Sequence, residues 1–228
     1  LHLRGRPKIL LTPNYETAQK FFKQYKENMI GVISDVRFPR KGTKYSEAGL
    51  DFAKWARDID PSIPILLQST QKENEVMANE VKADFLHKNS PTLLNDLREF
   101  MVNNFGFGDF IFRLPNREKV GTAQSMEQFI KGIKEIPAES LLYHANSHHF
   151  SNWIAARTEF NTASKLRKIF AHEFKDGDSL RTVLLKELNS GKKNSKVPVL
   201  NFASEDYRND KLDFIRLCGG SLGGKARG

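Results

Sequence analysis

Short apolar runs alternate with longer stretches of helical periodicity through the first half of the chain. The apolar runs predict strands at residues 8–11, 30–34, 63–67 and 83–87. Apolar residues that recur at spacings of three and four predict helices over residues 15–25, from residue 49 to the Asp60-Pro61 break, over 73–81 and over 91–105. This alternation predicts an α/β fold in which a doubly wound parallel sheet carries helices on both faces.

The alternation stops at Gly106-Phe107-Gly108, where the glycines predict a domain boundary. Beyond it, one strand over 110–114 and helices after Ser125, over 150–171 and over 178–188 predict a smaller α+β, mainly helical module. Residues 189–198 have the Gly, Ser, Asn and Lys content of a linker. We therefore expect one domain at 1–106, an interaction module at 107–188, and a linker with the start of another domain at 189–228.

Polar residues close three of the predicted strands. Asp35 follows the second apolar run, Ser69 and Thr70 follow the third, and Lys88 follows the fourth. The carboxyl ends of parallel strands converge in the crevice where open sheets bind their ligands. An acid, a hydroxyl and an amine at successive strand ends therefore predict a single site.

Residues 8–105 resemble the receiver domain of two-component response regulators, which has a flavodoxin-like fold. The matching pieces are Asp35-Val36-Arg37-Phe38-Pro39, Gly49-Leu50, Pro64-Ile65-Leu66-Leu67-Gln68-Ser69 and Phe85-Leu86-His87-Lys88. The resemblance implies that Asp35 accepts a phosphoryl group from a histidine kinase, that Ser69 or the adjacent Thr70 senses it, and that Lys88 pairs with it. A carboxylate can take this role when a cation and a divalent metal compensate the incoming negative charge.

The sequence departs from the receiver pattern before residue 8. Receivers begin with a strand that ends in acids which hold Mg²⁺, whereas residues 8–11 align with the family's second strand. Either this first strand precedes Leu1, or the domain binds no metal; Asp35 is a Mg²⁺ ligand only in the first case. A sheet that lacks this strand would expose an edge and favour self-association. The segment 40–46 also lengthens the loop after Asp35.

Three histidines lie close together in the second half. His144 and His148 are spaced to share a helical face, and His149 follows directly. A metal site would need a further ligand, and only Glu139 and Glu159 are near in the sequence. The alternative interpretation is a small aromatic core with histidines that form hydrogen bonds at its edge.

The chain ends in a glycine-rich segment that contains Gly223-Gly224-Lys225-Ala226. Backbone amides without side chains next to an ammonium group suit a nucleotide phosphate. The segment resembles the opening of the ATP-grasp nucleotide-binding domain of phosphoenolpyruvate synthase and pyruvate phosphate dikinase. The resemblance implies that Gly223, Gly224 and Lys225 contact ATP in a longer protein of which this chain is one piece.

Composition narrows the class of protein further. The net charge is +9, but basic residues are interspersed with acids, which argues against a nucleic-acid partner. The single cysteine, Cys218, excludes an internal disulfide, and no apolar stretch is long enough to span a membrane, so we expect a cytoplasmic protein.

Together these patterns predict the regulatory region of a phosphoenolpyruvate-synthase-like, ATP-dependent phosphotransferase. The fragment itself would not catalyse a reaction, and its partner would be the downstream catalytic domain. The alternative is a pseudo-receiver adaptor that is not phosphorylated and binds other proteins.

Overall fold

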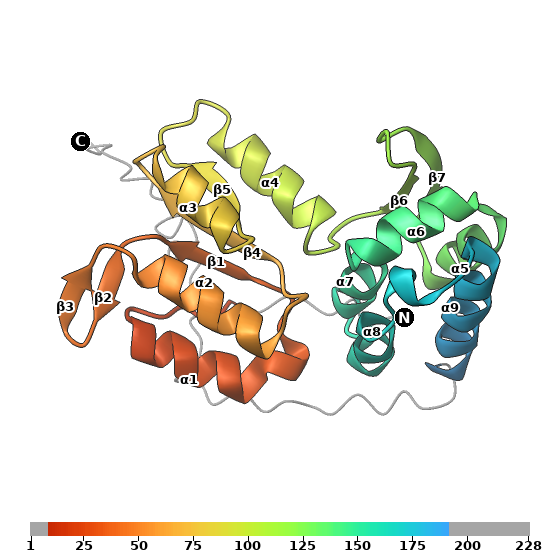
Figure 1. Cartoon of the computed structure of the whole chain (residues 1–228), viewed down its shortest axis with the longest axis horizontal. Helices are drawn as coiled ribbons and strands as arrows, with labels where there is room; N and C mark the ends of the chain where they lie inside the picture. The colour runs from red at the N-terminus through yellow and green to blue at the C-terminus, as the bar shows by residue number, and fades with distance from the viewer. Residues whose placement is uncertain (1–8, 192–228) are drawn as a thin grey trace, which may run out of the picture.

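The computed structural model describes residues 9–191, which form two halves joined after α4 (Figure 1). The first half contains α1 (Tyr15–Tyr25), η1 (Lys26–Asn28), β1 (Val32–Asp35), β2 (Phe38–Arg40), β3 (Thr43–Tyr45), α2 (Ala48–Ile59), β4 (Ile65–Ser69), α3 (Asn74–Glu80), β5 (Asp84–His87) and α4 (Leu93–Asn103). The second half contains β6 (Phe110–Arg113), β7 (Lys119–Ala123), α5 (Met126–Glu135), α6 (Ala138–Asn146), α7 (His149–Ala155), α8 (Phe160–Arg167), η2 (Ala171–Glu173) and α9 (Gly177–Gly191).

A three-stranded parallel sheet in the order β1-β4-β5 organises the first half, which confirms the α/β class. Successive side chains along its strands point to opposite faces of the sheet, and helices cover both faces. Ile65 and Leu67 pack with residues of α1, α2 and α3, whereas Leu66 packs with Leu97 and Phe100 of α4. Figure 1 shows α1 and α2 on one side of the sheet and α4 on the other.

The strand predicted at residues 8–11 is wrong in the part that the structure describes. Residues 9–12 have no regular structure, and Ile9 is 42% exposed. A strand forms only where a neighbour takes up its backbone hydrogen bonds. Among residues 9–191, no strand lies beyond β1 to provide that pairing.

The segment after Asp35 is a β-hairpin rather than the lengthened loop predicted at 40–46. Its strands β2 and β3 pair antiparallel, with Arg40 opposite Thr43. The two turn residues, Lys41 and Gly42, both have positive φ, the signature of a type I′ turn.

The second half packs helices around the antiparallel hairpin β6–β7. Its core is separate from that of the first half and centres on Phe112, Phe129, Trp153 and Leu180. The helix predicted over 150–171 is wrong as a single element, because the chain turns between α7 and α8. Thr158 there has a φ of 66°, a left-handed conformation that no continuous helix contains.

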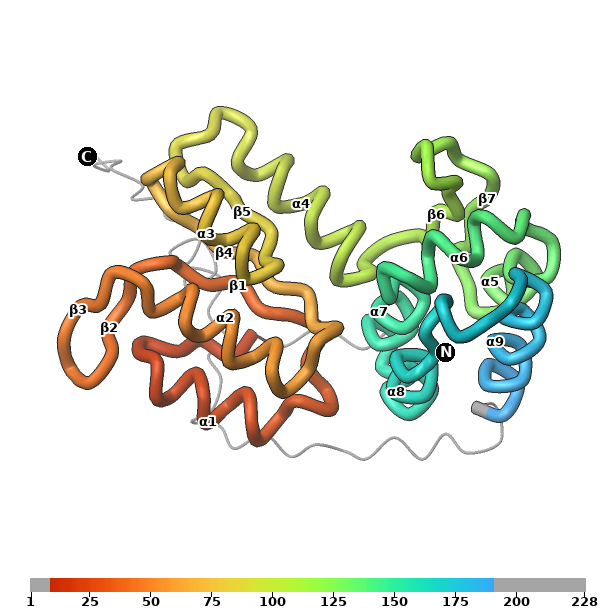
Figure 2. Tube along the Cα trace, viewed as in Figure 1, coloured from red at the N-terminus to blue at the C-terminus, as the bar shows by residue number. Residues whose placement is uncertain are grey.

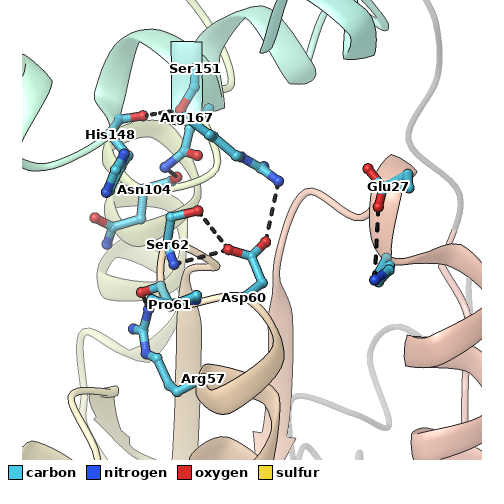
Figure 3. A network of polar contacts seen from close by, with 11 residues as sticks. Glu27, Arg57, Asp60, Pro61, Ser62, Asn104, His148, Ser151 and Arg167 are labelled. Carbon is cyan, nitrogen blue, oxygen red and sulfur yellow. Dashed lines mark hydrogen bonds and ion pairs between the residues drawn. The ribbon is translucent and has the colours of Figure 1, made fainter. Parts of the chain in front are cut away.

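The two halves meet where the chain crosses from one to the other (Figure 2). Gly106 lies so close to the backbone of Trp153 that a Cβ atom would overlap it, and its φ is +75°. Arg167 of α8 reaches across to the carboxylate of Asp60, 3.3 Å away, which also accepts hydrogen bonds from Ser62 (Figure 3). Asn152 donates a hydrogen bond to the carbonyl oxygen of residue 104. The halves are therefore joined by polar contacts as well as by the chain.

Candidate functional site

Asp35 and Lys88 form an ion pair at the carboxyl end of the parallel sheet. The Lys88 ammonium nitrogen lies 2.6 Å from the Asp35 carboxylate oxygen, and the Asp35 side chain is 42% exposed while that of Lys88 is 17% exposed. Asp35 is the last residue of β1, and Lys88 directly follows β5. The structure thus brings together the predicted acid and amine across the full width of the described sheet.

Backbone contacts fix the ends of these strands. The Val36 N–H donates to the Gln68 carbonyl, and the Lys88 N–H donates to the Ser69 carbonyl, at 2.9 and 2.8 Å. Gly49, in the first turn of α2, donates its N–H to the Val36 carbonyl. A Cβ at Gly49 would overlap the Asp35 carbonyl oxygen, so only glycine lets α2 approach this closely. The Asp35 carboxylate is therefore presented from a rigid support.

The predicted hydroxyls do not join the ion pair. The Ser69 hydroxyl accepts hydrogen bonds from the Gln71 N–H at 3.1 Å and from the Asn74 amide at 2.8 Å, at the start of α3. Thr70 is exposed, and its backbone carbonyl contacts the His87 ring nitrogen at 2.9 Å. Within the described residues, no hydrogen bond connects either hydroxyl to Asp35 or Lys88.

Strand register explains this separation. Asp35 is opposite Gln68, and Ser69 is opposite His87. Because side chains alternate between the faces of a sheet, Asp35 and Gln68 project from one face and Ser69 from the other. Lys88 falls on the same face as Asp35, two positions after the residue opposite Gln68.

Gln68 is a site residue that the sequence reasoning missed. Its side chain is 1% exposed, and both its amide atoms lack a hydrogen-bond partner among the described residues. A buried polar group without a partner costs stability and calls for an explanation. The signal was present in the sequence, because Gln68 directly follows the apolar run 63–67 and places a polar side chain in a strand whose other residues are apolar up to that point.

The cofactor predictions fall largely outside the described residues. Within 9–191, no three His, Cys, Asp or Glu side chains are grouped to hold a metal ion. The acids that would complete a Mg²⁺ site with Asp35 were expected on a first strand preceding Leu1, so the described residues do not test them. Gly223, Gly224 and Lys225, the expected ATP contacts, also lie outside it.

The histidine cluster belongs to the core of the second half. His144 is 3% exposed, and its ring contacts those of Phe110 and Phe150. Its Nε2 accepts a hydrogen bond from the Arg113 N–H at 2.8 Å, so its proton is on Nδ1, which donates to His149 Nδ1 at 3.0 Å. Burial lowers the pKa of His144 to about 3 and that of His149 to about 4. Both rings are therefore neutral, which supports the packing interpretation.

His148 does not share a helical face with His144, so that part of the prediction is wrong. It lies between α6 and α7 with a φ of 54°, and its ring meets that of Phe170 edge to face. Burial, and then the nearby Arg167 guanidinium, lower its pKa. Among the described residues, no hydrogen bond joins its ring to the His144–His149 pair.

Comparison with known proteins does not assign the chain to a family. No family model, curated protein or solved structure matches it. Helices long and apolar enough to cross a membrane are absent from the described part of the chain.

Proposed function

We propose that the chain is the receiver-like regulatory region of a phosphoenolpyruvate-synthase-like, ATP-dependent phosphotransferase, and that Asp35 is its phosphoryl acceptor. The observation that carries the proposal is the Asp35–Lys88 ion pair at the carboxyl end of parallel strands. The helix arrangement supports it, because α1 to α3 pack on one face and α4 on the other, as a doubly wound receiver fold requires. The link to the downstream enzyme rests on the segment 223–226.

The pair supplies a chemical basis for acyl phosphate formation. An Asp35 oxygen would attack the phosphorus of a small phosphoryl donor, and the donor's bond to phosphorus would break as its oxygen leaves. Lys88 would then offset the negative charge that accumulates on the phosphoryl oxygens. In the family's receivers a divalent metal shares this task, and Asp35 would be its ligand here.

Phosphorylation would also compete for existing contacts. The Ser69 hydroxyl would have to leave Gln71 and Asn74 to reach a phosphoryl oxygen, and this would shift the start of α3. The buried Gln68 amide lacks a hydrogen-bond partner among the described residues and lies on the same face as Asp35, which makes it a second candidate donor to the phosphoryl group. We expect the signal to pass from Asp35 towards α3.

The second candidate is a pseudo-receiver adaptor that binds proteins and is never phosphorylated. One observation favours it: the Ser69 hydroxyl is already bound on the opposite face of the sheet. In that case the Asp35–Lys88 pair serves only to hold the ends of β1 and β5 together. The two candidates differ in whether a phosphoryl mimic binds at Asp35.

An NMR titration with beryllofluoride and Mg²⁺ separates them. We expect amide shifts at Asp35 and Lys88 and further shifts along residues 69–74, because the mimic presents negative fluorides where phosphoryl oxygens would lie. The variant Asp35→Asn should show none of them, whereas Asp58→Asn, at an exposed residue of α2, should behave as the wild type. Equal spectra with and without the mimic would reject the acceptor role and leave the adaptor.

A further inference from the structure

The hairpin β2–β3 projects from the strand end that carries Asp35. Its register places Phe38 opposite Tyr45 and Pro39 opposite Lys44. The Pro39–Lys44 pair is one that makes no ladder hydrogen bonds. Pro39 has no N–H, and at this position its absence removes no hydrogen bond from the ladder. All of β3 is exposed, and among the described residues no strand pairs with its outer side.

One face of the hairpin is fixed to the first half. The Arg40 guanidinium lies over the Tyr15 ring, 4.4 Å from its centre, and forms an ion pair with Asp51. The Tyr15 and Phe38 rings stack 6.3 Å apart. At the turn, the Lys41 N–H donates to the Glu16 carboxylate at 3.0 Å, a bond that lowers the pKa of Glu16. The hairpin is therefore held in place by β2 and by the turn, and β3 is left exposed.

The rest of the hairpin carries positive charge to the solvent. Residues 37–45 contain four basic residues and no acid. Arg40 is paired as described, whereas Arg37, Lys41 and Lys44 are exposed and form no ion pair within the described residues. Tyr45, 40% exposed, projects from the opposite face to Lys44, with its ring centre 5.5 Å from the Arg40 guanidinium. An anchored cationic ribbon with an open edge has no evident role in holding the fold together.

We propose that this hairpin is a docking element for an acidic, extended polypeptide segment of a partner protein. Since the Pro39–Lys44 pair makes no ladder hydrogen bonds, the Lys44 N–H and C=O point to the open edge, where an extended segment can add as a strand. Carboxylates on that segment would then lie against Arg37, Lys41 and Lys44. This binding does not require phosphorylation of Asp35.

The surroundings favour a polypeptide over a nucleic acid. Glu16 is bonded at the turn, and Glu47 is exposed just after the hairpin. These carboxylates would repel a phosphate backbone that continues past the hairpin, whereas a short acidic segment needs only the hairpin itself. Each strand has three residues, which limits the contact to a few residues of the partner.

Fluorescence anisotropy with a labelled peptide of alternating glutamate and threonine tests the proposal at low salt. The hairpin variant Arg37→Gln, Lys41→Asn, Lys44→Thr removes three charges but keeps residues that suit the turn and the strand. The control variant Lys134→Gln, Lys168→Gln, Lys186→Gln removes three exposed charges from the second half. We expect the hairpin variant to bind at least tenfold more weakly than the wild type and the control variant to bind within about twofold.

The remaining outcomes are equally decisive. Asp35→Asn should retain the wild-type affinity, so that failure of the acceptor role and failure of hairpin docking are distinguishable. An equal loss in both triple variants would show attraction to the net charge alone and overturn the proposal. An absence of peptide binding would also overturn the proposal. So would a single-stranded DNA of equal charge that binds through the hairpin more tightly than the peptide does.

Discussion

Mild acid should destabilise the second half of the protein through its buried histidines. His144 and His149 are neutral in the folded chain, with pKa values of about 3 and about 4, because burial disfavours their charged forms. In the unfolded chain a histidine has a pKa near 6.5. The unfolded state therefore takes up protons that the folded state does not, so stability is full above about pH 6.5 and falls as the pH drops towards the folded pKa values.

The size of the effect follows from these values. One pKa unit corresponds to about 1.36 kcal/mol. At about pH 5 each ring is still neutral in the folded state but lies roughly 1.5 units below its unfolded pKa, which costs about 2 kcal/mol per ring. The pair should thus lower the free energy of unfolding by about 4 kcal/mol between roughly pH 7.5 and 5, a large share of the 5–15 kcal/mol typical of a domain. His148 acts in the same direction.

Urea unfolding followed by Trp153 fluorescence measures this loss, since Trp153 is buried in the same core. A Trp55→Phe background leaves Trp153 as the sole tryptophan. Adding His144→Gln and His149→Gln should lower stability at neutral pH but flatten its pH dependence by about 4 kcal/mol. His172→Gln, at an exposed residue, should keep the original dependence. An unchanged dependence in the double variant would refute the reasoning.

Two further substitutions test the junction between the halves. Gly106→Ala should lower the free energy of unfolding by about 3 kcal/mol or more, because the new methyl overlaps the Trp153 backbone and φ is positive. Gly108→Ala, where φ is positive but the space is open, should lower it by about 1 kcal/mol. Similar urea midpoints for the two variants would contradict this. Arg167→Met should lower the free energy of unfolding by about 1–3 kcal/mol, because it removes one of the polar links between the halves. Lys168→Met should leave it nearly unchanged in the same assay.

Periodicity predicted the helices of the first half well because each has one buried face. Phe21, Phe22 and Tyr25 of α1 recur at the spacings that define such a face. The hairpin β2–β3 was missed because residues 40–46 were interpreted as an extension of the loop after Asp35, although a two-residue Lys41-Gly42 turn is a hairpin signal. The division between α7 and α8 depends on a positive φ at Thr158, which no sequence pattern indicates.

The candidate site could be predicted only as far as strand ends determine it. Asp35 and Lys88 were predicted to meet because parallel strands end at one edge, and they do. Whether a neighbouring residue joins them depends on the face from which it projects, and that is set by register. Register places the Ser69 hydroxyl on the face where it binds Asn74. It places Gln68, a polar residue at the end of an apolar run, on the same face as Asp35.

The measurement that tests the acceptor role most directly is to locate a phosphoryl group chemically. The chain would be incubated with acetyl phosphate and Mg²⁺ and treated with hydroxylamine, which converts an aspartyl phosphate into a hydroxamate that peptide mass spectrometry can place. We predict a hydroxamate at Asp35, its loss in Asp35→Asn, its retention in Asp58→Asn, and a lower yield in Lys88→Met. No hydroxamate, or one at another carboxylate while Asp35 stays unmodified, would contradict the proposal.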